Sequence, residues 1–158
     1  MILIDGHNLL WSIHKPGTDG NPISDVQLCH LIGRYLKLVS ETGEIVFDGT
    51  GPSDKAGFDN INGLEVIFAG LATDADSVIE DKIKANTAPK RLTVVSSDRR
   101  LRSAARARKA AAVKSEVFGN NLQKRLSRKK PVREPAAKRL GISESETEQW
   151  LKFFNLDR

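Results

Sequence analysis

The sequence contains a single cysteine, Cys29, which excludes an internal disulfide and any cysteine-based metal cluster. Cys29 falls within a predicted helix, where a thiol more often packs than reacts. No apolar run approaches the roughly 18 residues that a membrane span needs. The opening residues also lack the basic segment and apolar core of a signal peptide. We therefore expect a cytoplasmic protein with no membrane partner.

Histidine is also scarce, and the three histidines show no spacing typical of metal ligands. Apolar residues make up 39% of the chain, which is somewhat low for a globular protein, and the shortfall is concentrated near the C-terminal end. A length of 158 residues suits one domain with a substantial hydrophobic core.

The net charge of +5 conceals a segregation of basic from acidic residues. Residues 99–139 carry 15 Lys and Arg and only two acidic residues, so their net charge is +13 and that of the remaining chain is −8. Such a block is typical of a protein that binds a polyanion, usually a nucleic acid. A merely solvated surface is the alternative, and the size of the block disfavours it.

The first ten residues, MILIDGHNLL, organise the rest of the chain. Residues 1–4 form an apolar run typical of a strand that is buried on both faces. Asp5 stands where this strand ends, Gly6 permits a sharp turn, and Asn8 precedes the next apolar residues. Ligands of open α/β sheets bind beyond the carboxyl ends of the strands, so we expect Asp5 and Asn8 at the floor of a cleft.

The remaining pattern alternates strands with helices, which predicts a parallel sheet. Predicted strands cover residues 1–4, 44–47, 64–68, 92–95 and, more weakly, 113–117. A loop is expected over residues 11–22. Predicted helices comprise one that opens at Ser24 with a capping box and ends at Gly43, and others over residues 73–86, 99–112 and 120–127.

Carboxylates follow successive strands of this predicted sheet. Asp5 follows the first strand, Asp48 the second and Asp98 the fourth. Asp76 lies in the first turn of the helix after the third strand, and Glu80 shares its helix face one turn later. Acids gathered at one sheet edge repel one another, which favours binding of a hard cation such as Mg²⁺ or Mn²⁺. Such an ion suits phosphate chemistry.

Each acid also has a local structural interpretation. Asp5 could form an Asp-Gly turn, Asp76 could complement the dipole of its helix, and Asp98 could cap the helix that follows it. Convergence of all four strand-associated acids by chance is improbable, so the pattern favours a shared site.

Four segments resemble the YacP-like branch of the NYN domains, which belong to the PIN-like nucleases. The segments are IDGHNLL at 4–10, VFDG at 46–49, LEVIFAGLATDADSVIEDKI at 64–83 and TVVSSDRRL at 93–101. The resemblance covers about residues 1–127. It implies an α/β fold, a Rossmann-like PIN/NYN three-layer sandwich with a mainly parallel central sheet, and the activity of a metal-dependent ribonuclease.

The resemblance also implies roles for individual residues. The predicted catalytic set is Asp5, Asn8, Asp48, Asp76, Glu80 and Asp98. His7 departs from the family pattern, because relatives often have Tyr at this position. Residues 128–158 lie outside the resemblance, so we divide the chain into a nuclease domain over residues 1–127 and a basic linker with a C-terminal helix over residues 128–158.

We expect an endoribonuclease in which Asp5, Asp76 and Asp98 hold Mg²⁺ or Mn²⁺ and water attacks the scissile phosphate. The predicted RNA-binding residues are Arg99, Arg100, Arg102, Arg128, Lys129 and Lys130. RNA, single-stranded or structured, is the expected partner. A ribosome or another ribonucleoprotein particle and a second copy of the chain are further candidate partners.

Two alternatives come from other functional classes. A catalytically inactive RNA-binding module explains the basic block equally well, but it gains nothing from acids that repel phosphate. A Toprim- or HAD-like phosphotransfer enzyme is suggested by the two acids of Asp74-Ala75-Asp76. Toprim chemistry expects Glu after the first strand, where Asp5 stands, and HAD chemistry expects a second Asp at the position of His7.

The C-terminal segment combines a basic arm with an apolar helix. Residues 128–139, RKKPVREPAAKR, contain two prolines and almost no large apolar side chains, which is typical of a linker. A last helix opens at Ser143 and carries Trp150, Leu151 and Phe154. We expect this apolar face to pack back on the domain, with docking onto a partner as the alternative.

Overall fold

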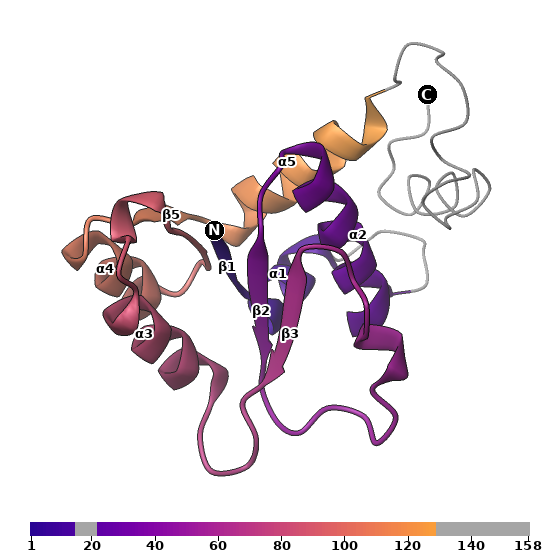
Figure 1. Ribbon diagram of the computed structural model, residues 1–158, viewed down its shortest axis with the longest axis horizontal. Coiled ribbons are helices and arrows are strands. Elements are labelled where there is room, and N and C mark those ends of the chain that lie inside the picture. The colour runs from indigo at the N-terminus through magenta and orange to yellow at the C-terminus, as the bar shows by residue number, and fades with distance from the viewer. Residues whose placement is uncertain (15–21, 129–158) are drawn as a thin grey trace.

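The computed structural model describes residues 1–14 and 22–128, which form a parallel sheet flanked by helices (Figure 1). Within these residues the strands are β1 (Ile2–Asp5), β2 (Gly43–Phe47), β3 (Leu64–Phe68), β4 (Thr93–Val95) and β5 (Ala111–Val113). Every pairing in the sheet is parallel, and the strand order is β3-β2-β1-β4-β5. The predicted α/β class and the parallel sheet are therefore confirmed.

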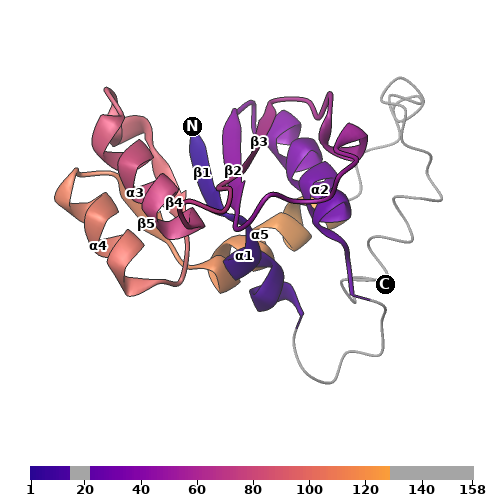
Figure 2. The same ribbon diagram turned by 90° about the horizontal axis from the view of Figure 1, so that it is seen from below.

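Helices cover both faces of the sheet and complete a three-layer sandwich. They are α1 (Gly6–Ile13), α2 (Asp25–Leu38), α3 (Ala75–Ala85), α4 (Arg99–Ala107) and α5 (Ser115–Ser127), with the short 3₁₀ helices η1 (Ala56–Phe58) and η2 (Pro89–Arg91). Two views at right angles place α3 and α4 together on one face, and α1, α2 and α5 on the other (Figures 1 and 2).

Alternating strand residues feed two separate hydrophobic cores, because neighbouring side chains of a strand point to opposite faces. Ile4 and Phe47 are fully buried in the core beneath α1, α2 and α5. Leu3 and Val46 are fully buried in the core beneath α3 and α4. Burial on both faces explains the unbroken apolar runs of the central strands.

The first β-to-α junction differs from the expected turn and loop. A helix, α1, begins directly at Gly6, so the expected loop over residues 11–22 is wrong for Trp11 and its two successors. A side chain at Gly6 would place its Cβ 2.5 Å from the ring of Phe47, so glycine is needed for close packing here. Leu9 and Ile13 anchor the helix, because both lie against Gly119 of α5.

Two helix ends also differ from the prediction. The backbone turns at Ser40 and Lys109, which adopt φ values of 54° and 62° after α2 and α4. In both places a bond from the next N–H to the helix completes a Schellman motif: Glu41 N–H donates to Leu36 O, and Ala110 N–H to Ala105 O. Neither motif uses a glycine, and Gly43, which was expected to end the first of these helices, lies beyond it. Gly43 consequently belongs to β2, and the helix expected over residues 99–112 ends early.

The early end of α4 shifts the elements that follow it. Strand β5 covers Ala111–Val113, so the strand expected over residues 113–117 is misplaced, and α5 begins at Ser115 instead of Asn120. No helix within the described ranges is both long and apolar enough to cross a bilayer. Lys129, Lys130 and the predicted last helix lie outside the described residues.

Candidate active site

The strand order creates a switch point between β1 and β4. The chain leaves β1 toward β2 and β3 on one side, then returns across the sheet to β4 and β5 on the other. Open α/β sheets bind ligands at such a point, just beyond the carboxyl ends of the strands. Asp5 is the last residue of β1, and Asp98 caps the helix that follows β4.

A cleft of about 290 Å³ opens at this switch point. Its described lining consists of Asp5, His7, Asn8, Trp11, Asp48, Asp76 and Asp98. The structure therefore brings together five of the six residues of the predicted catalytic set. Glu80 is the exception, because it is not among the residues that line the cleft.

Asp5 is an ionisable residue in a nearly closed environment, with only 6% of its surface exposed. Burial raises the pKa of its carboxyl from the ordinary 3.8 to about 6; the Ser96 hydrogen bond opposes the rise, and the charge of Asp76 adds to it. A buried carboxylate close to other acids is stabilised when a cation binds beside it.

Ser96, which is fully buried, connects two of the acids, and sequence reasoning did not identify its role. Its hydroxyl donates to Asp5 Oδ2 over 3.1 Å and accepts from the backbone N–H of Asp98 over 3.0 Å. One side chain thus fixes both the Asp5 carboxyl and the start of α4. The available signal was a serine directly after a buried strand and two residues before Asp98.

Asn8 is held by the elements on the opposite side of the switch point. Its Oδ1 atom accepts from the Ser97 N–H over 2.9 Å and from the Ser115 hydroxyl over 2.6 Å. These bonds join α1 to the loop between β4 and α4 and to the start of α5. Since the oxygen is engaged, the amide N–H groups are the part of Asn8 that can serve a ligand.

Asp48 and His7 form the side of the cleft near β2. Asp48 Oδ1 accepts from the Ala75 N–H over 2.7 Å and so caps the first turn of α3. Its Oδ2 atom lies 3.8 Å from His7 Nδ1, and His7 Nε2 lies 3.9 Å from Asp25. The His7 ring packs edge-on against Phe47, with 5.2 Å between centroids. His7 is therefore positioned by packing and by two carboxylates.

Asp76 and Asp98 each lie at the start of a helix and also line the cleft. Asp98 caps α4 by accepting from the Arg100 N–H over 2.7 Å, so the local interpretation of this residue holds together with its place in the cleft. Asp76 lies in the first turn of α3. Burial and then the charges of Asp98, Asp74 and Asp48 raise the pKa of Asp76, which shows that like charges meet here.

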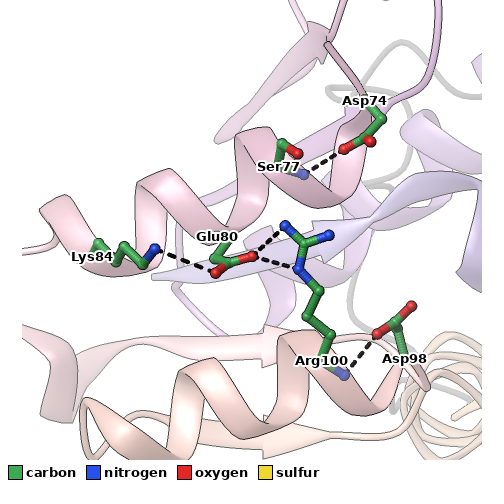
Figure 3. A network of polar contacts seen from close by, with 6 residues as sticks. All are labelled: Asp74, Ser77, Glu80, Lys84, Asp98 and Arg100. Carbon is green, nitrogen blue, oxygen red and sulfur yellow. Dashed lines mark hydrogen bonds and ion pairs between the residues drawn. The ribbon is translucent and has the colours of Figure 1, made fainter.

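Glu80 instead joins α3 to α4 beside the cleft (Figure 3). Its Oε2 atom accepts from Nε of Arg100 over 2.6 Å and lies 2.6 Å from a terminal nitrogen of the same guanidinium. Lys84 Nζ lies 3.3 Å from the other oxygen of Glu80. Hydrogen bonds from Arg100 and Lys84 lower the pKa of Glu80, so the carboxylate stays ionised.

The predicted RNA-binding residues fall into different environments. Arg99 and Arg128 are exposed. Arg100 is engaged by Glu80, as described above. Arg102 is half-buried, and its Nε atom is buried without a hydrogen-bond partner among the described residues.

The donor chemistry of the cleft fits a hard divalent cation. Carboxylate oxygens dominate its lining, and such ligands suit Mg²⁺ or Mn²⁺ better than zinc. Within the described ranges, no three His, Cys, Asp or Glu side chains form a preformed metal-binding group. Mg²⁺ is commonly bound by one or two carboxylates, with water and substrate phosphate as its other ligands, so the cleft suits that mode of binding.

A three-layer sandwich with a 3-2-1-4-5 parallel sheet and acids at its switch point defines a Rossmann-like protein of the PIN-like nuclease fold. The chain belongs to the YacP-like NYN domain family, whose model matches residues 2–154. The match continues past residue 127, where the resemblance that we identified from the motifs ends.

Solved structures give the same picture of the fold. The crystal structure of Rae1 (YacP) from Bacillus subtilis is 20% identical, with a TM-score of 0.64 over 98% of this chain and 92% of that chain. The W164L mutant of the same protein is 18% identical, with a TM-score of 0.57 over 97% and 90% of the two chains. A search of curated proteins found no match.

Proposed function

We propose that this protein is a metal-dependent endoribonuclease that hydrolyses RNA phosphodiester bonds in the cleft at the switch point. The observation that carries the proposal is the convergence of Asp5, Asp48, Asp76 and Asp98, from four separate β-to-α junctions, on one cleft. Membership of a family with a PIN-like nuclease fold supports it. A purely electrostatic RNA binder would gain nothing from four acids that repel phosphate.

Asp5, Asp76 and Asp98 are the residues that would hold Mg²⁺ or Mn²⁺. When bound, such an ion neutralises the phosphodiester and lowers the pKa of a coordinated water. Ser96 keeps the carboxyl of Asp5 and the start of α4 in fixed relation. The amide N–H groups of Asn8 are placed to donate to a phosphate oxygen or to a water in the cleft.

Flanking phosphates require cations outside the acidic lining. Arg99 is exposed in the first turn of α4, directly after Asp98, and Arg128 is exposed at the end of α5. These two arginines, with Lys129 and Lys130 beyond the described residues, are proposed to bind the RNA backbone. Arg102 is also proposed to bind the RNA backbone, through the part of its side chain that remains exposed, because its Nε atom is buried.

The test is cleavage of a single-stranded RNA with Mg²⁺ or Mn²⁺, and its arrest by EDTA. Asp5→Asn and Asp98→Asn should each reduce kcat by at least about a hundredfold, because both remove charge from the cation site. Asp81→Asn is the matched control, since Asp81 is an exposed acid of α3 that does not line the cleft. It should cleave at the wild-type rate.

Two results would overturn the proposal in different ways. Wild-type rates in both cleft variants would show that the assigned acids are wrong. RNA binding by the wild-type protein without cleavage under any divalent ion would favour the inactive RNA-binding module.

A further inference from the structure

Among the described residues that line the cleft, Trp11 is the one large aromatic side chain that is mostly exposed to solvent. It is 80% exposed and lies on α1, one turn after His7. Tryptophan is normally well covered in folded proteins. An indole left in solvent beside a row of carboxylates therefore calls for an explanation.

Packing of α1 does not supply that explanation. The helix is attached through Leu9, which is fully buried, and through Leu10 and Ile13, which pack against the same core. Trp11 is not among the residues that pack against this core. His7, which shares its helix face at a spacing of four residues, already packs its ring against Phe47, so Trp11 is the ring that remains available to a ligand.

The charge of the cleft narrows the class of ligand that could contact this ring. The described lining contains four Asp and no Lys or Arg, so phosphate groups are repelled except where a cation bridges them. A nucleobase is neutral and presents a flat π face to an aromatic ring. Stacking of bases on aromatic side chains is a common mode of single-strand recognition, and it tolerates different bases because every base has a π face.

We propose that Trp11 is a stacking platform for one base of single-stranded RNA, next to the phosphate that enters the acidic cleft. This subsite rests on the proposed function and adds to it a preference for unpaired RNA. The bases of a duplex are already stacked and paired, so their faces are closed to the indole.

The test compares Trp11→Ala with Trp11→Phe in the binding of a short oligoadenylate by the full-length protein. Mg²⁺ is kept, because the cleft admits phosphate only with a cation, and phosphorothioate linkages in the oligoadenylate block cleavage. Trp11→Ala should weaken binding about tenfold, the loss expected for one base stack. Trp11→Phe should retain most of the affinity. The slope of log K against log salt concentration should stay at the wild-type value, because no phosphate contact is removed.

Leu71→Ala is the matched control. Leu71 is 89% exposed and is not among the residues that line the cleft, so its removal should leave the affinity unchanged. All three variants should melt at the wild-type temperature, since both side chains are largely in solvent. A Trp150→Phe background leaves Trp11 as the sole tryptophan, and its fluorescence should be quenched by the oligoadenylate and not by a duplex.

A series of oligoadenylates with one abasic nucleotide at each position completes the test. At the stacking position the wild-type protein should lose affinity, and Trp11→Ala should lose nothing further. Equal affinity of Trp11→Ala and wild type, or a loss that is the same across the whole abasic series, would overturn the stacking subsite. So would a change in oligomeric state with unchanged RNA affinity.

The two proposals fail separately. If the wild type binds the oligoadenylate through Trp11 but never cleaves RNA, the nuclease assignment falls and the stacking subsite stands. If the wild type cleaves RNA and Trp11→Ala has unchanged affinity and KM, the stacking subsite alone falls.

Discussion

At the scale of single residues, Asp5 combines burial with charge, and the two oppose each other. The carboxyl is 6% exposed, accepts one hydrogen bond from Ser96 and stands near other acids, so the pKa rises to about 6. Ionised Asp5 lowers the stability of the folded protein. Such a carboxylate is typical of a functional site, where the ionised form binds a ligand.

Asp5→Asn should therefore stabilise the protein at neutral pH. In the folded state Asp5 keeps its proton up to about pH 6, whereas in the unfolded chain it loses it near 3.8. The folded state consequently binds more protons between these values, so wild-type stability falls as pH rises across this window, by up to about 3 kcal/mol. Urea denaturation at several pH values should show the stability difference between variant and wild type growing from pH 4 to pH 7.

The control for this prediction is Asp81→Asn, which changes an exposed carboxyl. Its stability difference should be small and nearly independent of pH across the same window. A stability difference for Asp5→Asn that does not vary with pH would contradict the proposed cause.

At the scale of elements, the packing of α3 against α4 is set partly by charge. Arg100 of α4 reaches Glu80 of α3 through two nitrogens, and Lys84 holds the second carboxylate oxygen (Figure 3). Asp76 and Asp98 stand near the starts of the same two helices. A contact that joins the two helices also ties these two acids together, so we propose that Glu80 and Arg100 act as positioning residues.

This arrangement predicts opposite behaviour for two adjacent arginines. Arg99→Ala should weaken RNA binding and lower the salt slope by about one, as expected for the loss of one phosphate contact. Arg100→Ala should leave the salt slope unchanged and instead reduce kcat, with more Mg²⁺ needed for half-maximal activity. Cleavage and binding assays on both variants, over a range of salt and Mg²⁺ concentrations, distinguish the two roles.

Glu80→Gln provides the matching test from α3. If the pair acts as a unit, the double variant Glu80→Gln/Arg100→Ala should cleave RNA no more slowly than the worse single variant. A fully additive loss would mean that Glu80 and Arg100 act independently.

At the scale of the whole molecule, charge is separated along the chain, with +13 in residues 99–139 and −8 elsewhere. The described part of the basic block begins at α4, which starts from the edge of the acidic cleft. RNA would thus be attracted to surfaces beside the cleft, while the cleft itself admits phosphate only with a cation. Residues 99–139 would thus contribute mainly to affinity, and the acids of the cleft mainly to catalysis.

Replacing Arg128, Lys129 and Lys130 together with Ser should therefore weaken the binding of single-stranded RNA. The slope of log K against log salt concentration should flatten by up to about two. Turnover at saturating RNA should change little, because these residues lie outside the cleft lining. The matched control replaces Lys37, Lys90 and Arg91, three exposed basic residues outside the block. An unchanged slope in the first variant would show that the arm does not contact the RNA backbone.

The sequence alone determined the parallel α/β class and the carboxylate that follows each of several strands. Both are local properties: an apolar run of four or five residues favours a buried strand, and the residue after it stands at the sheet edge whatever the strand order. The same local reasoning failed at the ends of α2 and α4, because Ser40 and Lys109 adopt positive φ without the glycine that usually signals such a turn.

Which of these acids share a cleft depends on how distant elements pack in the folded chain. The strand order places β1 beside β4, so Ser96 can bind both Asp5 and the backbone of Asp98. Asp5 and Ser96 are 91 positions apart in the sequence. Glu80 shares a helix face with Asp76, yet Arg100 from another element holds it beside α4. Local sequence determines which element carries a side chain. Its contact partner depends on long-range packing, because residues of distant elements come together only when those elements pack.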